Sequence, residues 1–219
     1  DNGTIYLYYD CIEDLYNPSF ETNMGTNGWE TYEANISSSS ERALFGQKSL
    51  RINANPVVSA SAYTGDYYYS NIKNPANLAA PAGLEVTPNT YFIASAYFWG
   101  DANTTMDIIV QQYRNDPMFN YWGNLIQNAN AISTIQGNNN WQRIFVKFQT
   151  RPETRAITIS LGNHNAVTTT SFWDGIQLER IGDTQNDPSD FPQDVNFDKS
   201  IENTAGWKTC VATSTDGIN

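Results

Sequence analysis

The chain has 219 residues, and its 23 Asp and Glu against 12 Lys and Arg give a formal net charge of −11 at pH 7. Nucleic acid is not expected as a partner, because phosphate contacts need clustered cationic side chains. Membrane insertion is not expected either, since no apolar run approaches the roughly 18 residues of a membrane span. Aromatic residues make up 13% and charged residues 16%, which is typical of a globular protein that faces an uncharged ligand.

Alternation of apolar and polar residues predicts strands along most of the chain. In chain order, the expected strands are residues 5–9, 48–53, 66–72, 90–99, 106–113, 142–150, 156–161 and 171–179. In the clearest run, one face carries a row of four apolar side chains: Phe92, Ala94, Ala96 and Phe98. The opposite face of that run carries Tyr97 and Trp99. No segment has a helical period with caps, so the predicted fold class is all-β, an antiparallel two-sheet β-sandwich.

The two ends of the chain differ from its centre. Residues 1–16 are expected to form an extension that contains the strand at 5–9, and residues 17–182 are expected to form the sandwich. Residues 183–219 are polar and rich in turns, which predicts a tail that runs over the surface. Cys11 and Cys210 lie near opposite ends, where a disulfide would close almost the whole chain. Two cysteines establish neither a bridge nor a compartment, so both alternatives stay open.

Nothing in the sequence marks a catalytic site. His164 is the single histidine, which excludes metal sites built from several histidines, and its neighbours Asn163 and Asn165 predict a surface turn. No nucleophile elbow or phosphate-binding loop occurs, and nothing singles out a carboxylate pair for glycoside hydrolysis among the 23 acids. We therefore do not expect an enzyme, although a glycoside hydrolase or lyase on this fold is the last of the alternatives.

Several separated segments together resemble a known family. They are Asn17-Pro18-Ser19-Phe20-Glu21, Gly28-Trp29, Gly46-Gln47-Lys48-Ser49-Leu50, Val86-Thr87-Pro88-Asn89-Thr90-Tyr91, Trp141-Gln142-Arg143 and Phe172-Trp173-Asp174-Gly175-Ile176-Gln177-Leu178-Glu179. In this order and spacing they resemble the jelly-roll carbohydrate-binding modules of families 4, 9, 16 and 22, over about residues 17–182. The closing Gln-Leu-Glu followed by Gly also resembles the ending of such modules in bacteriophage tail and other virion proteins.

The resemblance implies a structural calcium ion. Glu21 and Asp174 match the two carboxylates of the family site, and the backbone carbonyls of Ser19, Phe45 and Lys48 match its other oxygen donors. Hard oxygen ligands suit Ca²⁺, which would join the first and last strands rather than perform chemistry. The alternative is that Glu21 and Asp174 only accept hydrogen bonds from turns.

The resemblance also implies a surface on which aromatic rings stack on sugars and polar side chains bind hydroxyl groups. The candidates for this surface are Tyr97, Trp99, Tyr67, Tyr69, Gln111, Tyr113 and Trp122. They would form one platform if they lie side by side on one sheet. The alternative is that these rings pack under long loops, under the tail, or against a neighbouring subunit.

The predicted function is a non-catalytic module that binds a glycan or another surface polymer, within a bacteriophage virion protein such as a tail fibre or a capsid decoration. The predicted location is accordingly the virion or the extracellular space. Other virion subunits and further copies of the chain are partners that the resemblance implies. Two alternatives stay open: a carbohydrate-binding module of a secreted polysaccharide hydrolase, and a purely structural virion subunit whose aromatic face other chains bury.

Overall fold

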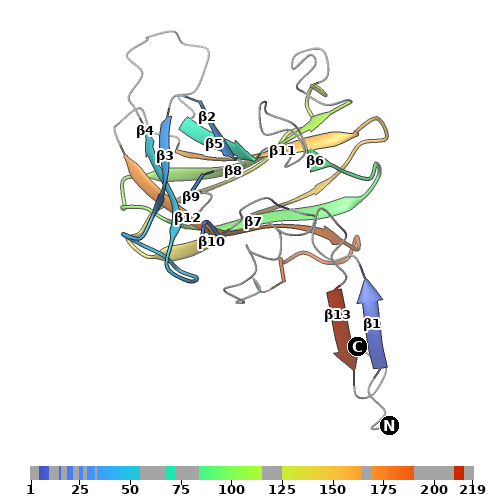
Figure 1. Cartoon of the computed structure of the whole chain (residues 1–219). Helices are drawn as coiled ribbons and strands as arrows, with labels where there is room; N and C mark the ends of the chain where they lie inside the picture. The colour runs from blue at the N-terminus through green and yellow to red at the C-terminus, as the bar shows by residue number, and fades with distance from the viewer. Residues whose placement is uncertain are drawn as a thin grey trace.

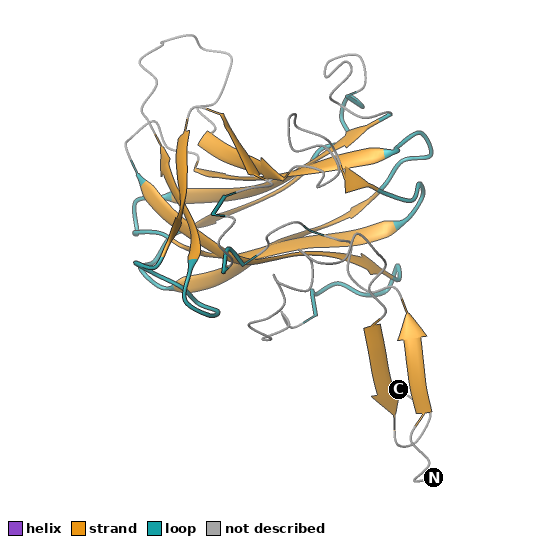
Figure 2. Ribbon diagram, viewed as in Figure 1, coloured by secondary structure: helices purple, strands orange, loops and turns teal. Residues whose placement is uncertain are grey.

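The structure is a computed structural model that describes residues 5–9, 15, 19–21, 25–26, 29–32, 34–54, 68–72, 84–114, 125–163, 169–189 and 210–214. These residues form strands and loops, and every strand pair among them is antiparallel (Figures 1 and 2). The predicted all-β fold class is therefore confirmed. Among the described residues, no helix has the length and hydropathy needed to cross a membrane.

Two sheets lie face to face and form a sandwich (Figure 1). The first, which we call the β7 sheet, has five strands in the order β10 (Trp141–Gln149), β7 (Tyr91–Trp99), β12 (Thr170–Ile181), β4 (Ser49–Ala54) and β3 (Ala34–Ser39). The second, the β8 sheet, has the order β2 (Trp29–Tyr32), β5 (Tyr68–Ile72), β11 (Ala156–Asn163), β8 (Thr105–Tyr113) and β9 (Ala131–Gln136). A short strand, β6 (Leu84–Glu85), also pairs with β11.

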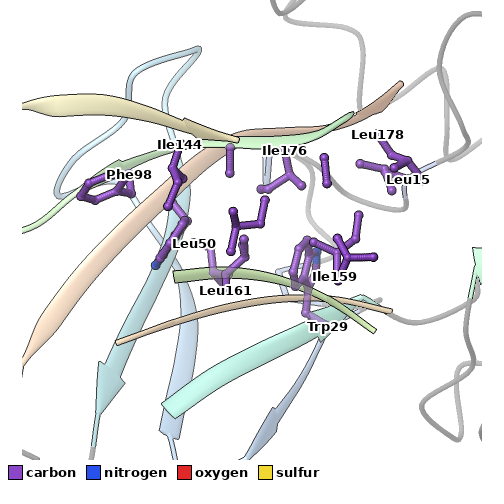
Figure 3. Packing of buried hydrophobic residues seen from close by; sticks show 14 of the residues in the cluster. Leu15, Trp29, Leu50, Phe98, Ile144, Ile159, Leu161, Ile176 and Leu178 are labelled. Carbon is purple, nitrogen blue, oxygen red and sulfur yellow. The ribbon is translucent and has the colours of Figure 1, made fainter. Parts of the chain in front are cut away.

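The core lies between the two sheets and is built from the predicted alternation (Figure 3). The apolar row of β7 is fully buried, as predicted: Phe92, Ala94, Ala96 and Phe98. Ile157, Ile159 and Leu161 of β11 face it from the other sheet and are also fully buried. Burying a large apolar side chain stabilises the fold by about 1.5–3 kcal/mol, so this layer provides the main favourable term.

The sequence predicted the long, apolar strands well, whereas it missed some polar ones. The expected strands at residues 90–99, 106–113 and 142–150 correspond to β7, β8 and β10 within one residue at each end. The strands β3 and β9 were not expected. They are the last strands at the edges of their sheets and are rich in Ser, Thr, Asn and Gln, so their apolar alternation is weak.

The two ends of the chain meet outside the sandwich. The strand β1 (Ile5–Tyr9) was predicted, and it pairs with β13 (Cys210–Ser214), which was not. Figure 1 shows this two-stranded sheet beside the sandwich. The register places Cys210 opposite Tyr9, and Cys11 lies outside the described residues.

Candidate functional site

The rings of Tyr97 and Trp99 lie on the outer face of the β7 sheet and are packed by the chain itself. The Phe45 ring contacts the Tyr97 ring edge-on at a centroid distance of 5.2 Å. The Arg42 guanidinium lies 3.7 Å from the centroid of the Trp99 ring, within cation–π range. Both aromatic side chains are only half-exposed. The loop that carries Arg42 and Phe45 therefore contacts both rings, and each ring keeps some exposed surface.

The polar candidates Gln111 and Tyr113 lie on the other sheet. Both belong to β8 and face away from the core, since Met106, Ile108 and Val110 form the buried row of that strand. The seven candidates therefore do not form one platform, because Tyr97 and Trp99 are on β7 in the opposite layer. The backbone register aligns Tyr69 of β5 with Gly162 of β11, so that residue belongs to the β8 sheet as well. Tyr67, Trp122 and His164 lie outside the described residues.

The outer face of the β8 sheet carries hydrogen-bonding side chains that are held in place from beneath. Asp107 is fully buried, although it faces away from the core, and its carboxylate accepts a hydrogen bond from the hydroxyl of the exposed Thr134 on β9. Tyr113 is also fully buried, and its hydroxyl donates to the side-chain amide oxygen of Gln111, Oε1, at 3.1 Å. The Tyr113 hydroxyl lies 3.4 Å from the Thr158 hydroxyl on β11. A buried group thus orients each of the two accessible side chains, Thr134 and Gln111.

Tyr113 therefore has a different role from the one predicted for it. Its ring packs in a small cluster with Leu125 and Ala156 and is not available for stacking on a ligand. Sequence reasoning missed Asp107, Thr134 and Thr158. A signal was present for Asp107, because a carboxylate between Met106 and Ile108 interrupts an apolar run at the same parity as Gln111.

The five predicted metal ligands converge on the loop of residues 44–48, which we call the carboxylate loop. Asp174 of β12 accepts hydrogen bonds at 2.9 Å from the amides of Leu44 and Phe45 through Oδ2. Glu21 accepts hydrogen bonds at 2.8 Å from the amides of Gln47 and Lys48 through Oε1. The Ser19 hydroxyl donates to Asp174 Oδ1 at 3.1 Å. Residues that are up to 155 positions apart in sequence therefore meet at one loop.

Local backbone geometry makes this meeting possible. Phe20 stands between Ser19 and Glu21 with a φ of 63°, an unusual left-handed value for a large residue. Its ring is fully buried and lies 5.6 Å from the Trp29 ring, so core packing holds the strained backbone in place. Gly46 also has a φ of 63°, and a Cβ built on it would lie 2.4 Å from Glu21 Cδ. Glycine is therefore required where Glu21 rests on the loop.

The oxygen atoms gathered at the carboxylate loop are of the type that a hard cation binds. Asp174 is fully buried, and burial raises the pKa of its carboxyl from 3.8 to about 7, although four hydrogen bonds, including those from Phe45 and Leu44, act to lower that pKa. In the described part of the chain, Asp174 forms no ion pair with a Lys or Arg. No cluster of three or more acidic, His or Cys side chains occurs in the described part of the chain, so any cation would depend on these two carboxylates with Ser19 and backbone oxygens.

The strand arrangement defines a jelly-roll β-sandwich, the fold that solved carbohydrate-binding modules also have. A family 16 carbohydrate-binding module is 19% identical with a TM-score of 0.51, over 75% of this chain and 98% of that one. The xylan-binding CBM22-1 domain of Paenibacillus barcinonensis Xyn10C is 16% identical with a TM-score of 0.51, over 74% and 90%. Tailspike protein 4 of bacteriophage CBA120 is 12% identical with a TM-score of 0.51, over 78% of this chain and 22% of the tailspike.

At these identities the similarity establishes the fold. No family model matches the sequence. No curated protein matches it either.

Proposed function

We propose that the chain is a non-catalytic glycan-binding module and that its ligand lies on the outer face of the β8 sheet. The observation that carries this proposal is the pair of oriented side chains, Gln111 fixed by Tyr113 and Thr134 fixed by Asp107. Side chains that are held in one rotamer before binding lose little conformational entropy when a ligand arrives. Such an arrangement favours recognition of fixed hydroxyl groups on a sugar.

The charge on this face indicates a neutral ligand. Neither Lys nor Arg occurs in β8, β9 or β11, and the one carboxylate on the outer face of these strands is that of Asp107. A sugar hydroxyl can form hydrogen bonds with the Gln111 amide and the Thr134 hydroxyl, whereas an anionic sugar would meet no cation on these three strands. The net charge of −11 also disfavours an anionic ligand, because it would repel one.

The test is binding to a panel of soluble neutral polysaccharides, measured by retarded migration in native gels and by Trp fluorescence. We expect Gln111→Ala and Thr134→Ala each to weaken binding roughly 5- to 30-fold, the effect of losing about 1–2 kcal/mol of hydrogen bonding. Gln149→Ala is the matched control, because Gln149 is exposed on β10 of the other sheet and should not matter. No response to the panel from a folded protein would favour the structural-subunit alternative.

We further propose that the module belongs to a bacteriophage virion protein, as part of a tail fibre or a capsid decoration, located on the virion or outside the cell. The shared fold with part of a phage tailspike supports this context. The shared fold with the xylan-binding domain of Xyn10C supports the second candidate, a module attached to a secreted polysaccharide hydrolase. The genes beside the coding sequence separate the two, since virion structural genes are expected in the first case and hydrolase domains in the second. Size-exclusion chromatography with light scattering tests for homo-oligomers.

We also propose that Ca²⁺ is held between Glu21, Asp174 and the oxygens of Ser19, Phe45 and Lys48. When bound, the ion would neutralise two carboxylates and connect residues 19–21, the carboxylate loop and β12. Chelation with EDTA should lower the melting temperature, and added calcium should restore it. Glu21→Gln keeps an oxygen that can accept the loop amides but removes the charge, so this variant should lose the dependence on EDTA.

Glu41→Gln is the matched control for the calcium experiment. Glu41 pairs with Arg51 at 3.3 Å, and both groups are substantially exposed, so its loss should leave the response to EDTA intact. A melting temperature of the unmodified protein that does not change with EDTA would show that Glu21 and Asp174 serve only as hydrogen-bond acceptors for the loop.

A further inference from the structure

Residues 183–189, which we call the strap, follow β12 and lie across the outer face of the β7 sheet. Two cations of β10 bind the strap: Lys147 Nζ donates to the Asp183 carbonyl at 2.6 Å and to Asn186 Oδ1 at 3.1 Å. Arg143 Nη2 donates to the Ser189 carbonyl at 2.6 Å. The carboxylate of Glu179 on β12 accepts the Ser189 amide with both oxygens, at 3.0 Å each. In this contact the charged side chains belong to the sheet, and the groups that the strap contributes are neutral.

The face beneath the strap is buried although it points away from the core. Ile93 and Ser95 of β7 are 0% and 1% exposed, and Gln177 and Glu179 of β12 are 2% and 3% exposed. The strap itself has no large apolar side chain and is mostly exposed. Because it gains little from apolar burial, hydrogen bonds hold it, and each contributes only modestly to stability. A segment of this kind can open locally without unfolding of the sandwich.

The strap leaves part of the hydrogen-bonding capacity of the Arg143 guanidinium unused. Its Nη2 is shared among three neutral acceptors: the Ser95 hydroxyl at 3.1 Å, Gln177 Oε1 at 3.1 Å and the Ser189 carbonyl at 2.6 Å. Its Nε is buried and has no hydrogen-bond partner. The Nε and Nη2 hydrogens point in parallel from one edge of the guanidinium, which is the fork that a carboxylate accepts in a bidentate manner. The strap offers this fork no carboxylate.

The surroundings of Arg143 are suited to a sugar. The guanidinium lies 5.1 Å from the centroid of the Tyr97 ring, and Lys147 Nζ lies 5.4 Å from the centroid of the Tyr91 ring. Glu179 accepts the Ser189 amide and a hydrogen bond from Gln177, a role that a sugar hydroxyl can take. The two outer faces thus differ in charge, because strands β8, β9 and β11 carry no cation.

We propose that the outer face of the β7 sheet is a second ligand site, specific for a carboxylated sugar, and that the strap keeps it closed. A uronic acid residue would replace the strap, with its carboxylate on the Arg143 fork, a hydroxyl on Glu179 and a further oxygen on Lys147. The strap and the ligand compete for the same three side chains, so binding and strap release are coupled. The site is independent of the one proposed on the β8 sheet.

The test uses the full chain and trigalacturonic acid as the probe, with xylohexaose as the neutral comparison, both by isothermal titration calorimetry. Asn186→Ala combined with Ser189→Pro removes a Lys147 acceptor and the amide that Glu179 accepts, while leaving the sheet unchanged. We expect this loosened strap to raise the affinity for trigalacturonic acid at least tenfold and to leave that for xylohexaose unchanged. Thr184→Ala is the matched control, because Thr184 is an exposed strap residue.

A second substitution tests the fork. Arg143→Lys in the loosened variant should abolish the gain, because lysine offers a point charge without a planar fork. Hydrogen exchange of the peptide that contains residues 183–189 reports whether the strap has been released. Released strap with unchanged affinity, an equal gain for xylohexaose, or full binding after Arg143→Lys would each overturn the proposal. If the loosened variant fails to fold, the unmodified protein decides: saturating trigalacturonic acid must speed exchange in the strap, and unchanged exchange overturns the proposal.

Discussion

Replacing Gly46 by alanine tests how the carboxylate loop holds Glu21. A Cβ at this position would lie 2.4 Å from Glu21 Cδ and 2.5 and 2.8 Å from its two oxygens. Because real Cβ atoms do not approach other atoms so closely, the carboxylate must move away in Gly46→Ala. It then loses the two hydrogen bonds at 2.8 Å from the amides of Gln47 and Lys48.

The magnitude follows from two contributions. The φ of 63° at Gly46 costs alanine about 1 kcal/mol. Loss of two hydrogen bonds to a half-exposed carboxylate costs about 1–2 kcal/mol more, after a reduction for solvent screening. The free energy of unfolding in EDTA should therefore fall by about 2–3 kcal/mol, which equals a loss of roughly 4–12 °C in melting temperature for a domain of this size. Equilibrium urea unfolding measures it directly.

A matched glycine separates the two contributions. Gly25 has a φ of 62°, and nothing lies within 4 Å of a Cβ built there, so Gly25→Ala should cost only the backbone contribution of about 1 kcal/mol. In a Glu21→Ala background, Gly46→Ala should also cost only that amount. Equal losses for Gly46→Ala and Gly25→Ala in the unmodified background would refute the close contact between Gly46 and Glu21.

Three further predictions concern other parts of the fold. Gln112 is 3% exposed; its amide nitrogen donates to the carbonyls of Ala129 and Gln149, and its oxygen accepts from Arg151 and Thr154. Gln112→Glu should therefore destabilise the protein by roughly 3 kcal/mol at pH 7. Since burial raises the pKa of the introduced carboxyl, the lost stability should return as the pH falls, and urea unfolding that does not depend on pH would contradict this. Tyr97→Ala should lower the free energy of unfolding by about 2 kcal/mol, because packing on Phe45 is lost, and should leave neutral-glycan binding unchanged. A variant of unchanged stability that no longer binds neutral glycans would contradict this and would indicate that Tyr97 contacts the sugar. Cys210 lies opposite Tyr9, and Cys11 follows Tyr9 by two residues, a chain length of at most about 7 Å that permits a disulfide. Thiol labelling with intact mass should therefore detect no free cysteine under non-reducing conditions, and two labelled thiols would refute the bridge.

The alternation of side chains within one strand could be predicted from the sequence, whereas the sheet to which a strand belongs could not. Tyr97 lies opposite the apolar row that was predicted for its strand, and that row is buried; the strand of Gln111 was predicted, and its apolar row is buried as well. The sequence contains nothing that assigns β7 and β8 to different layers, because that depends on pairing with β12 and β11, far along the chain. A surface that unites residues of several strands is therefore harder to predict than the core beneath it.

At the carboxylate loop, by contrast, the sequence did predict which distant segments meet. Glu21 and Asp174 are 153 positions apart, and composition or periodicity could not bring them together. The motifs that resemble carbohydrate-binding modules did, and the structure places both carboxylates on residues 44–48. The same resemblance predicted carbonyl donors from Phe45 and Lys48, while the structure shows their amides donating to the carboxylates. The motif thus predicted which segments meet, and the metal remains a separate proposal.

A bulge in β12 connects the carboxylate loop to the strap. The register shifts between Asp174 and Gln177, with Gly175 at a φ of 56°. Because of the extra residue, Ile176 faces the core at 1% exposed, while Asp174 and Gln177 both face outward. In a regular strand, Asp174 outward would place Gln177 and Glu179 inward, since the side-chain period is two. One inserted residue thus lets a single strand present Asp174 to the loop and Gln177 and Glu179 to the strap. Deletion of Gly175 would remove the bulge and leave a regular strand in which Asp174, Gln177 and Glu179 still face outward, so both contacts should survive it.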